Sequence, residues 1–162
     1  MEQSVKVRNR LAELGVTDLC QTPHLPAGRA EAGPPVAHGR AFQALRAAAP
    51  PLPRLHRGAE VMLDRPISRP VALARNVTLA GSGYILVEFP RLVAQETVVN
   101  ALTQVVQQGL IPVLAHPERY SCCSPEAVRH WRGLGARMQV DATTLLTSQA
   151  RGQRARQRIT EG

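Results

Sequence analysis

The sequence contains few cysteines and no long apolar run, and each shortage excludes a class of protein. Only three of its 162 residues are cysteines, and two of these are adjacent (Cys20, Cys122 and Cys123). This count argues against a disulfide framework, and the spacing argues against a zinc knuckle, which needs separated thiolates. No stretch of eighteen apolar residues predicts a membrane-spanning helix, and the first twenty residues lack the apolar centre of a signal peptide. A cytoplasmic protein is therefore expected.

Lysine and aromatic residues are also scarce, and this changes the meaning of the positive charge. Lys6 is the only lysine, so the formal net charge of +8 comes from arginine, and arginine together with abundant alanine and proline is typical of a GC-rich genome. Five aromatic residues are too few for the stacking that nucleic-acid binders commonly use, so no nucleic-acid partner is expected. A non-catalytic basic binding module remains an alternative, based on a C-terminal cluster of Arg151, Arg154, Arg156 and Arg158.

The pattern of apolar residues predicts alternating strands and helices in one α/β domain with a parallel sheet, either a barrel or doubly wound. The predicted strands cover residues 16–20, 57–63, 84–90, 111–115 and 138–140. The predicted helices cover residues 2–14 and 41–49, a segment with an apolar face from 98 to 106, and a segment that opens at 124–126. Gly15, Gly109 and Gly135 are expected to end three of these helices.

Three segments depart from this alternation. Residues 25–53 are rich in proline, glycine and alanine, and we expect a long excursion or flexible loop there. Residues 64–83 have no clear pattern. The basic stretch 150–162 is expected to form a final helix or a tail.

Four residues with metal-binding chemistry fall on or after predicted strands. His24 follows one strand, Glu60 lies within a second, Glu88 lies at the end of a third and His116 closes a fourth. Because the carboxyl ends of parallel strands converge on one site, these side chains predict a centre for a divalent metal of the Mn/Zn/Fe class. Such an ion can acidify water or polarise a phosphoryl oxygen.

Each of these residues also has a structural explanation. His24 could cap the next helix, Glu60 could lie on an exposed edge, and His116 could be a core histidine that bonds a carbonyl group. Glu88 is harder to explain in this way, because a carboxylate within an apolar strand is costly to bury without a partner. Arg119 could form a salt bridge to Glu118 or to Glu88.

The adjacent cysteines do not form the site of a cysteine phosphatase, which uses a Cys-x5-Arg loop. Arg129 lies six positions after Cys123 and inside a predicted helix, and Cys122 has no arginine at the required spacing. The remaining histidines are expected to be structural or solvent-facing; they are His38, His56 and His130.

Four segments of the sequence resemble successive motifs of one family. They are the block from Gly15 to His24, the Gly58-Ala-Glu60-Val block, the block from Tyr84 to Pro90, and the block from Gly109 to Tyr120, which contains His-Pro-Glu-Arg-Tyr. In this order they resemble the bacterial manganese-dependent tyrosine-protein phosphatases of the PHP (polymerase and histidinol phosphatase) superfamily, which are encoded with capsule and exopolysaccharide genes.

This resemblance implies a distorted seven-stranded β/α barrel with three metal ions at the strand ends. It makes His24, Glu60, Glu88 and His116 ligands of manganese or another divalent transition metal, with Glu60 bridging two ions. Arg119 would contact the phosphate of a phosphotyrosine protein, such as a bacterial tyrosine kinase, and metal-activated water would hydrolyse it. A histidinol-phosphate-type phosphoesterase of the same superfamily remains the nearest alternative.

Two motifs of that family have no counterpart in the chain. Its opening Asp-x-His-x-His strand does not occur before Val16, and its closing Ser-Asp-x-His segment does not occur before Gly162. The resemblance therefore predicts a single partial domain over residues 1–162, truncated at both ends, with an incomplete barrel.

Overall fold

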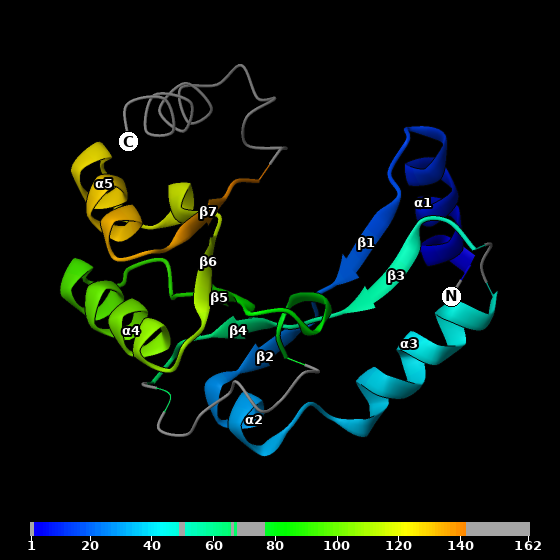
Figure 1. Cartoon of the computed structure of the whole chain (residues 1–162), viewed down its shortest axis with the longest axis horizontal. Helices are drawn as coiled ribbons and strands as arrows, with labels where there is room; N and C mark the ends of the chain where they lie inside the picture. The colour runs from blue at the N-terminus through cyan, green and yellow to red at the C-terminus, as the bar shows by residue number, and fades with distance from the viewer. Residues whose placement is uncertain (1, 49–50, 66, 68–76, 142–162) are drawn as a thin grey trace.

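The chain forms an α/β structure whose paired strands are all parallel. The computed structural model describes residues 2–48, 51–65, 67 and 77–141. The larger sheet has the order β2-β4-β5-β6-β7, and a second sheet pairs β1 with β3 (Figure 1). The strands are β1 (Asp18–Gln21), β2 (His24–Pro26), β3 (Arg54–Arg57), β4 (Glu60–Met62), β5 (Tyr84–Glu88), β6 (Ile111–Ala115) and β7 (Arg137–Gln139). The predicted parallel α/β class is confirmed, and within the described residues the larger sheet is open.

Each strand of the smaller sheet is followed closely along the chain by a strand of the larger sheet. Two residues separate β1 from β2, and two separate β3 from β4. Proline at position 23 has no amide hydrogen, but its carbonyl oxygen accepts a hydrogen bond from the amide of Glu60 at 3.0 Å. A Cβ atom at Gly58 would lie 2.9 Å from the sulfur of Cys20, so the close approach of the strands requires glycine there. The strand predicted over 57–63 therefore contains β4 and only the last residue of β3, which begins earlier, at Arg54.

The helices end where the glycines predict. Among the described residues, the α-helices are α1 (Glu2–Glu13), α2 (Ala27–Ala32), α3 (Val36–Ala48), α4 (Gln95–Gln107) and α5 (Pro125–Gly133), with short 3-10 turns at η2 (Leu79–Gly81) and η3 (Pro117–Arg119). Gly15, Gly109 and Gly135 follow α1, α4 and α5 with φ angles of 83°, 78° and 98°, the left-handed conformation that favours glycine. The hydroxyl of Ser124 accepts a hydrogen bond from the amide of Ala127 at 3.1 Å and caps α5, so this helix begins within the predicted 124–126.

The segment expected to be an excursion contains two helices. α2 and α3 follow β2 directly, and α3 begins at Val36 rather than at residue 41. Ala27 and Ala30 are buried on α2, and Phe42 and Leu45 on α3, so both helices pack against the rest of the fold through apolar side chains. Residues 150–162, which include the basic cluster, lie outside the described residues.

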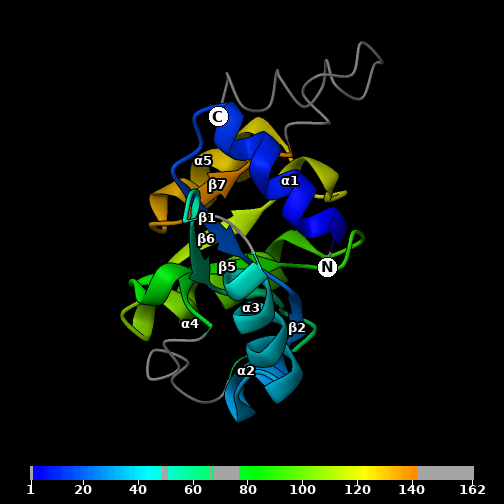
Figure 2. The same cartoon turned by 90° about the vertical axis from the view of Figure 1, so that its right-hand side faces the viewer.

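The helices pack along the sheets. α4 contacts β6, α5 contacts β7, and α4 contacts α5. α1 contacts α3 at the other end of the molecule, beside the β1–β3 sheet, and Figure 2 turns this pair toward the viewer. No helix within the described ranges is long and apolar enough to span a membrane.

The core lies between the larger sheet and its helices. β5 occupies the centre of that sheet, and four of its five residues, Ile85 to Glu88, are buried, as expected for a strand covered on both faces. Trp131 of α5 and Leu102 of α4 are both fully buried in the same cluster. The one acidic residue of β5, Glu88, therefore lies at the edge of a tightly packed interior.

Candidate metal centre

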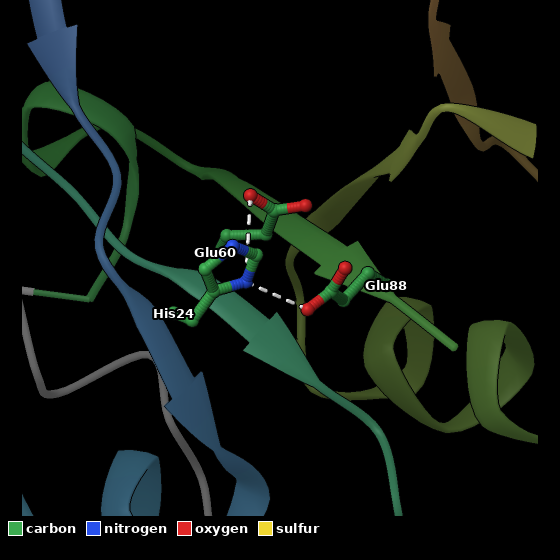
Figure 3. A group of neighbouring side chains, drawn as sticks. All are labelled: His24, Glu60 and Glu88. Atoms are coloured by element: carbon green, nitrogen blue, oxygen red, sulfur yellow. Dashed lines mark hydrogen bonds and ion pairs between the residues drawn. The ribbon is translucent and has the colours of Figure 1, made fainter. Parts of the chain in front are cut away.

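Two histidines and two glutamates from four different segments meet at one point of the larger sheet. The Nδ1 atom of His24 lies 2.8 Å from Oε1 of Glu88 and 3.8 Å from Oε2 of Glu60. The Nε2 atom of His116 lies 2.8 Å from Oε1 of Glu60 and 3.6 Å from Oε2 of Glu88. Each imidazole thus faces both carboxylates, and Figure 3 shows three of these side chains. We call these four residues the His/Glu cluster.

The parallel register places three members of the cluster on one face. His24 of β2 lies opposite Glu60 of β4, so both side chains leave the sheet on the same side. Glu60 lies opposite Leu86 of β5, and Glu88 follows two residues later. Because side chains alternate along a strand with a period of two, Glu88 shares that face.

His24 follows a strand, as predicted, and it also begins the next one. It lies three positions after the end of β1 and is the first residue of β2. After the two-residue break that follows β1, the chain enters β2 at His24, which pairs with Glu60 of β4. The side chain of His24 is 72% exposed, whereas those of Glu60 and Glu88 are 13% and 8% exposed, so it forms the open side of the cluster.

His116 joins the cluster through an unusual backbone conformation. It directly follows β6, and its φ and ψ of 32° and 55° lie in the left-handed region, which few residues other than glycine adopt. In a continued strand, its side chain would point away from the face that Ala115 shares with Glu60. The left-handed residue turns the chain out of the strand, and the amide of His116 donates to the carbonyl oxygen of Gln139 at 2.7 Å.

Tyr120 fixes the loop that carries His116. Its hydroxyl donates to the carbonyl oxygen of Ala115 at 2.7 Å and accepts from the amide of Phe89 at 3.2 Å. The rings of Tyr120 and Phe89 pack edge to face with centroids 6.0 Å apart. Burial raises the pKa of the Tyr120 hydroxyl well above its ordinary value, so the hydroxyl remains a donor. Tyr120 therefore ties the end of β5 to the end of β6.

Replacement of Tyr120 by phenylalanine tests this connection. We expect the free energy of unfolding to fall by about 1–3 kcal/mol, because two buried backbone groups lose their partner. Urea denaturation gives the value. Tyr84→Phe is the matched control, since Tyr84 begins β5 with a 39% exposed side chain, and a loss equal to that of Tyr120→Phe would contradict the connection.

The electrostatics of the cluster favour a cation. Burial raises the pKa of Glu88, the hydrogen bond from His24 opposes this change, and the neighbouring charge of Glu60 raises the pKa further. His24, Glu60 and Glu88 each offer one atom that could bind a metal ion, and these three atoms lie within 4.8 Å of one another. Two carboxylates at this separation repel each other, and a divalent cation between them would remove the repulsion.

The donor set fits a transition metal. Imidazole nitrogen and carboxylate oxygen together suit Mn, Fe and Zn, whereas an all-oxygen set would suit Mg or Ca. The Nδ1 atom of His116 is buried without a hydrogen-bond partner among the described residues, so an added group at this atom would satisfy it. The residues present are therefore chemically suited to hold such an ion.

Arg119 lies at the end of η3 but is not part of the cluster. Its guanidinium group forms an ion pair with Asp141, beyond β7, and within the described residues it makes no hydrogen bond to any of the four side chains. Its side chain is 44% exposed. The pair with Asp141 was not foreseen from the sequence, because the two residues lie on separate loops that only the sheet brings together.

The other candidates behave as the sequence indicated. Arg129 lies within α5 and pairs with Glu126 at 3.2 Å, and Cys123 is buried, so no phosphate-binding cysteine loop forms there. His56 donates to the carboxylate of Asp18 at 2.7 Å, which is a structural role.

The fold is similar to that of a solved phosphatase. The match is to a structure from a study of YwqE from Bacillus subtilis and CpsB from Streptococcus pneumoniae, which that study describes as unique metal-dependent tyrosine phosphatases. The TM-score is 0.70 at 24% sequence identity, and the match covers 88% of this chain and 59% of that chain. The chain thus spans less than two thirds of the length of its structural relative.

The family itself follows from the sequence. A profile of the family described as "Capsular polysaccharide synthesis, CpsB/CapC" matches residues 1–160, which is almost the whole chain. The assignment to capsule-associated proteins, expected from the four motifs, is confirmed. This chain therefore belongs to the CpsB/CapC family of capsular polysaccharide synthesis.

Proposed function

We propose that this chain is a metal-dependent protein-tyrosine phosphatase that acts in the cytoplasm in the regulation of capsular polysaccharide synthesis. The observation that carries the proposal is the His/Glu cluster, in which two imidazoles and two carboxylates converge within hydrogen-bond distance. The described activity of the structural relative and the matched family support the same reaction.

The proposed ligands are His24, Glu60, Glu88 and His116, with Glu60 positioned to bridge two ions. The two oxygens of Glu60 face different histidines, Oε1 toward His116 and Oε2 toward His24, an arrangement that Glu88 shares and that is compatible with a bridging role. We propose manganese, or another divalent transition metal, as the ion. When bound, it would supply Lewis-acid chemistry by acidifying water and neutralising phosphoryl charge.

The proposed substrate group is the phosphate of phosphotyrosine, and Arg119 is the proposed contact. A guanidinium group binds two phosphate oxygens in a fork and stabilises charge that develops during transfer. The guanidinium group of Arg119 is paired with the carboxylate of Asp141. A phosphate dianion would compete with this carboxylate for the guanidinium group. We propose a bacterial tyrosine kinase as the protein substrate.

A hydrolysis assay tests the proposal. The purified chain is expected to release phosphate from a phosphotyrosine peptide with Mn²⁺, and to lose this activity when a chelator removes the metal. Arg119→Ala should lower kcat/KM by about 10²–10³-fold, as for the loss of one donor to a developing oxyanion. Arg119→Lys keeps the positive charge but lacks the two-pronged geometry of the guanidinium group. Its kcat/KM should lie between those of the unchanged chain and Arg119→Ala.

Histidinol phosphate and a phosphoserine peptide serve as comparison substrates. Faster hydrolysis of histidinol phosphate than of the phosphotyrosine peptide would assign the chain to the other phosphoesterase class. Activity that survives complete chelation would refute a metal-dependent reaction.

A further inference from the structure

A hollow lies between the start of α3 and β3 of the β1–β3 sheet. This hollow of about 520 Å³ is lined by Pro34, Pro35, Val36, Gly39, Arg40, Gln43 and Arg57. A smaller pocket shares Pro34 and Arg57 with it. We call the two together the Arg40–Arg57 hollow.

The hollow carries two arginines that have no acidic partner. Within the part of the chain that the structure describes, no ion pair or hydrogen bond to a carboxylate involves Arg40 or Arg57. By contrast, Arg54, the first residue of β3, forms an ion pair with Asp18 at 2.8 Å. The unpaired guanidinium groups make the hollow positive.

Arg57 is already held in place. Its guanidinium carbon lies 5.8 Å from the centre of the Phe42 ring, within range of a cation–π interaction. Its Nη2 atom lies 3.6 Å from where a Cβ atom of Gly39 would be, so the guanidinium rests against α3. A guanidinium ordered in this way loses less side-chain entropy when it binds a ligand.

The walls of the hollow suit an extended peptide. Pro34 and Pro35 have no amide hydrogens, and the side chain of Val36 is 73% exposed, so one wall is apolar. The Nδ1 atom of His38, which lines the smaller pocket, is buried without a hydrogen-bond partner among the described residues. A peptide backbone group could fill that position.

The lining of the smaller pocket includes sequence neighbours of two residues of the His/Glu cluster. The smaller pocket is also lined by Pro23 and Gly58, which lie one residue before His24 and two residues before Glu60. A ligand that occupied the hollow would therefore run alongside the chain segments that carry two proposed metal ligands.

We propose that the Arg40–Arg57 hollow binds an acidic segment of the protein substrate, next to its phosphotyrosine. This rests on the proposed function and adds to it a sequence preference, namely for glutamate or aspartate residues near the target tyrosine. Arg40 and Arg57 bind the carboxylates, and the proline-lined wall contacts the apolar part of the segment. The predicted preference comes from charge complementarity outside the reacting group.

A binding experiment without catalysis tests the hollow. A fluorescent peptide carries a run of glutamates beside an unphosphorylated tyrosine, and a second peptide has glutamine in place of glutamate. Fluorescence polarisation is measured without added metal, so a failure of the phosphatase reaction would leave this result unaffected. Arg40→Gln/Arg57→Gln should weaken binding of the glutamate peptide by about tenfold, the effect of one or two charge-assisted hydrogen bonds.

The charge-matched control is Arg10→Gln/Arg46→Gln, at two exposed helix positions outside the hollow. It should keep the wild-type affinity. Arg40→Gln alone changes an exposed side chain and should weaken binding about threefold, which keeps the test valid if the double variant unfolds. Equal affinity of hollow and control variants, or equal binding of the two peptides, would overturn the proposal. Tighter binding of a single-stranded oligonucleotide through the same arginines would also overturn it.

Discussion

Replacement of Glu88 by glutamine is expected to weaken manganese binding by at least about 100-fold, because even the outer partners of a metal ligand contribute about 10–100-fold. The substitution keeps the volume of the side chain and a carbonyl oxygen that can still accept from His24, but it removes the charge. His116→Ala, which removes an imidazole that faces both carboxylates, is expected to have an effect of the same size. Isothermal titration of the folded metal-free chain with Mn²⁺ gives both affinities.

Two exposed residues provide matched controls for these variants. Glu96 lies in the first turn of α4 and His130 in the last turn of α5, and both are exposed. Glu96→Gln and His130→Ala should therefore bind Mn²⁺ like the unchanged chain. If Glu88→Gln and His116→Ala also kept that affinity, the His/Glu cluster would not be the metal site, and the proposed function would lose its main support.

Truncation of Trp131 to alanine is expected to lower the free energy of unfolding by about 3–5 kcal/mol, the usual cost of removing a buried large aromatic side chain. Trp131 is completely buried on α5 within the main core cluster. The cavity would lie where α5 meets α4 and β7, so neighbouring side chains can fill it only in part. Chemical denaturation followed by circular dichroism gives the change.

Leu92→Ala is the control for this truncation, because the side chain of Leu92 is 84% exposed. Its effect should stay within about 0.5 kcal/mol, as for most surface substitutions. An average substitution lowers the free energy of unfolding by about 1 kcal/mol. If Trp131→Ala lowered it by less than this, α5 would contribute little to the stability of the core.

The regular elements were predictable where the apolar pattern is strong. β6 matches its prediction at residues 111–115 and β5 covers the first five residues of the predicted 84–90, because each is a continuous apolar run. α2 was missed, since its sequence Ala-Gly-Arg-Ala-Glu-Ala has no apolar periodicity. Its position depends on tertiary contacts, which include those with β2 and β4 and the ion pair of Glu31 with Arg65. The start of α3 was missed for the same reason, because its first buried residue is Phe42.

The composition of the candidate site was also predictable, but its geometry was not. Carboxylates and imidazoles on or beside strand segments indicated a metal centre because parallel strands deliver such residues to one place. No sequence pattern specifies that His116 adopts a left-handed conformation, or that Tyr120 bonds the ends of two strands. The pair of Arg119 with Asp141 likewise depends on loops that are distant in sequence.

The sequence by itself determined the class of fold, the family and the chemistry of the four candidate ligands, because apolar runs and residue types are local properties. Only the tertiary structure decided that these ligands face one another, because the register of β2, β4 and β5 fixes which face each side chain occupies. A slip of one residue in any of these pairings would move a ligand to the opposite face of the sheet. The arginine-rich composition did not predict where positive charge would be concentrated. The tertiary structure brings Arg40 and Arg57, which are 17 positions apart in the sequence, to one hollow.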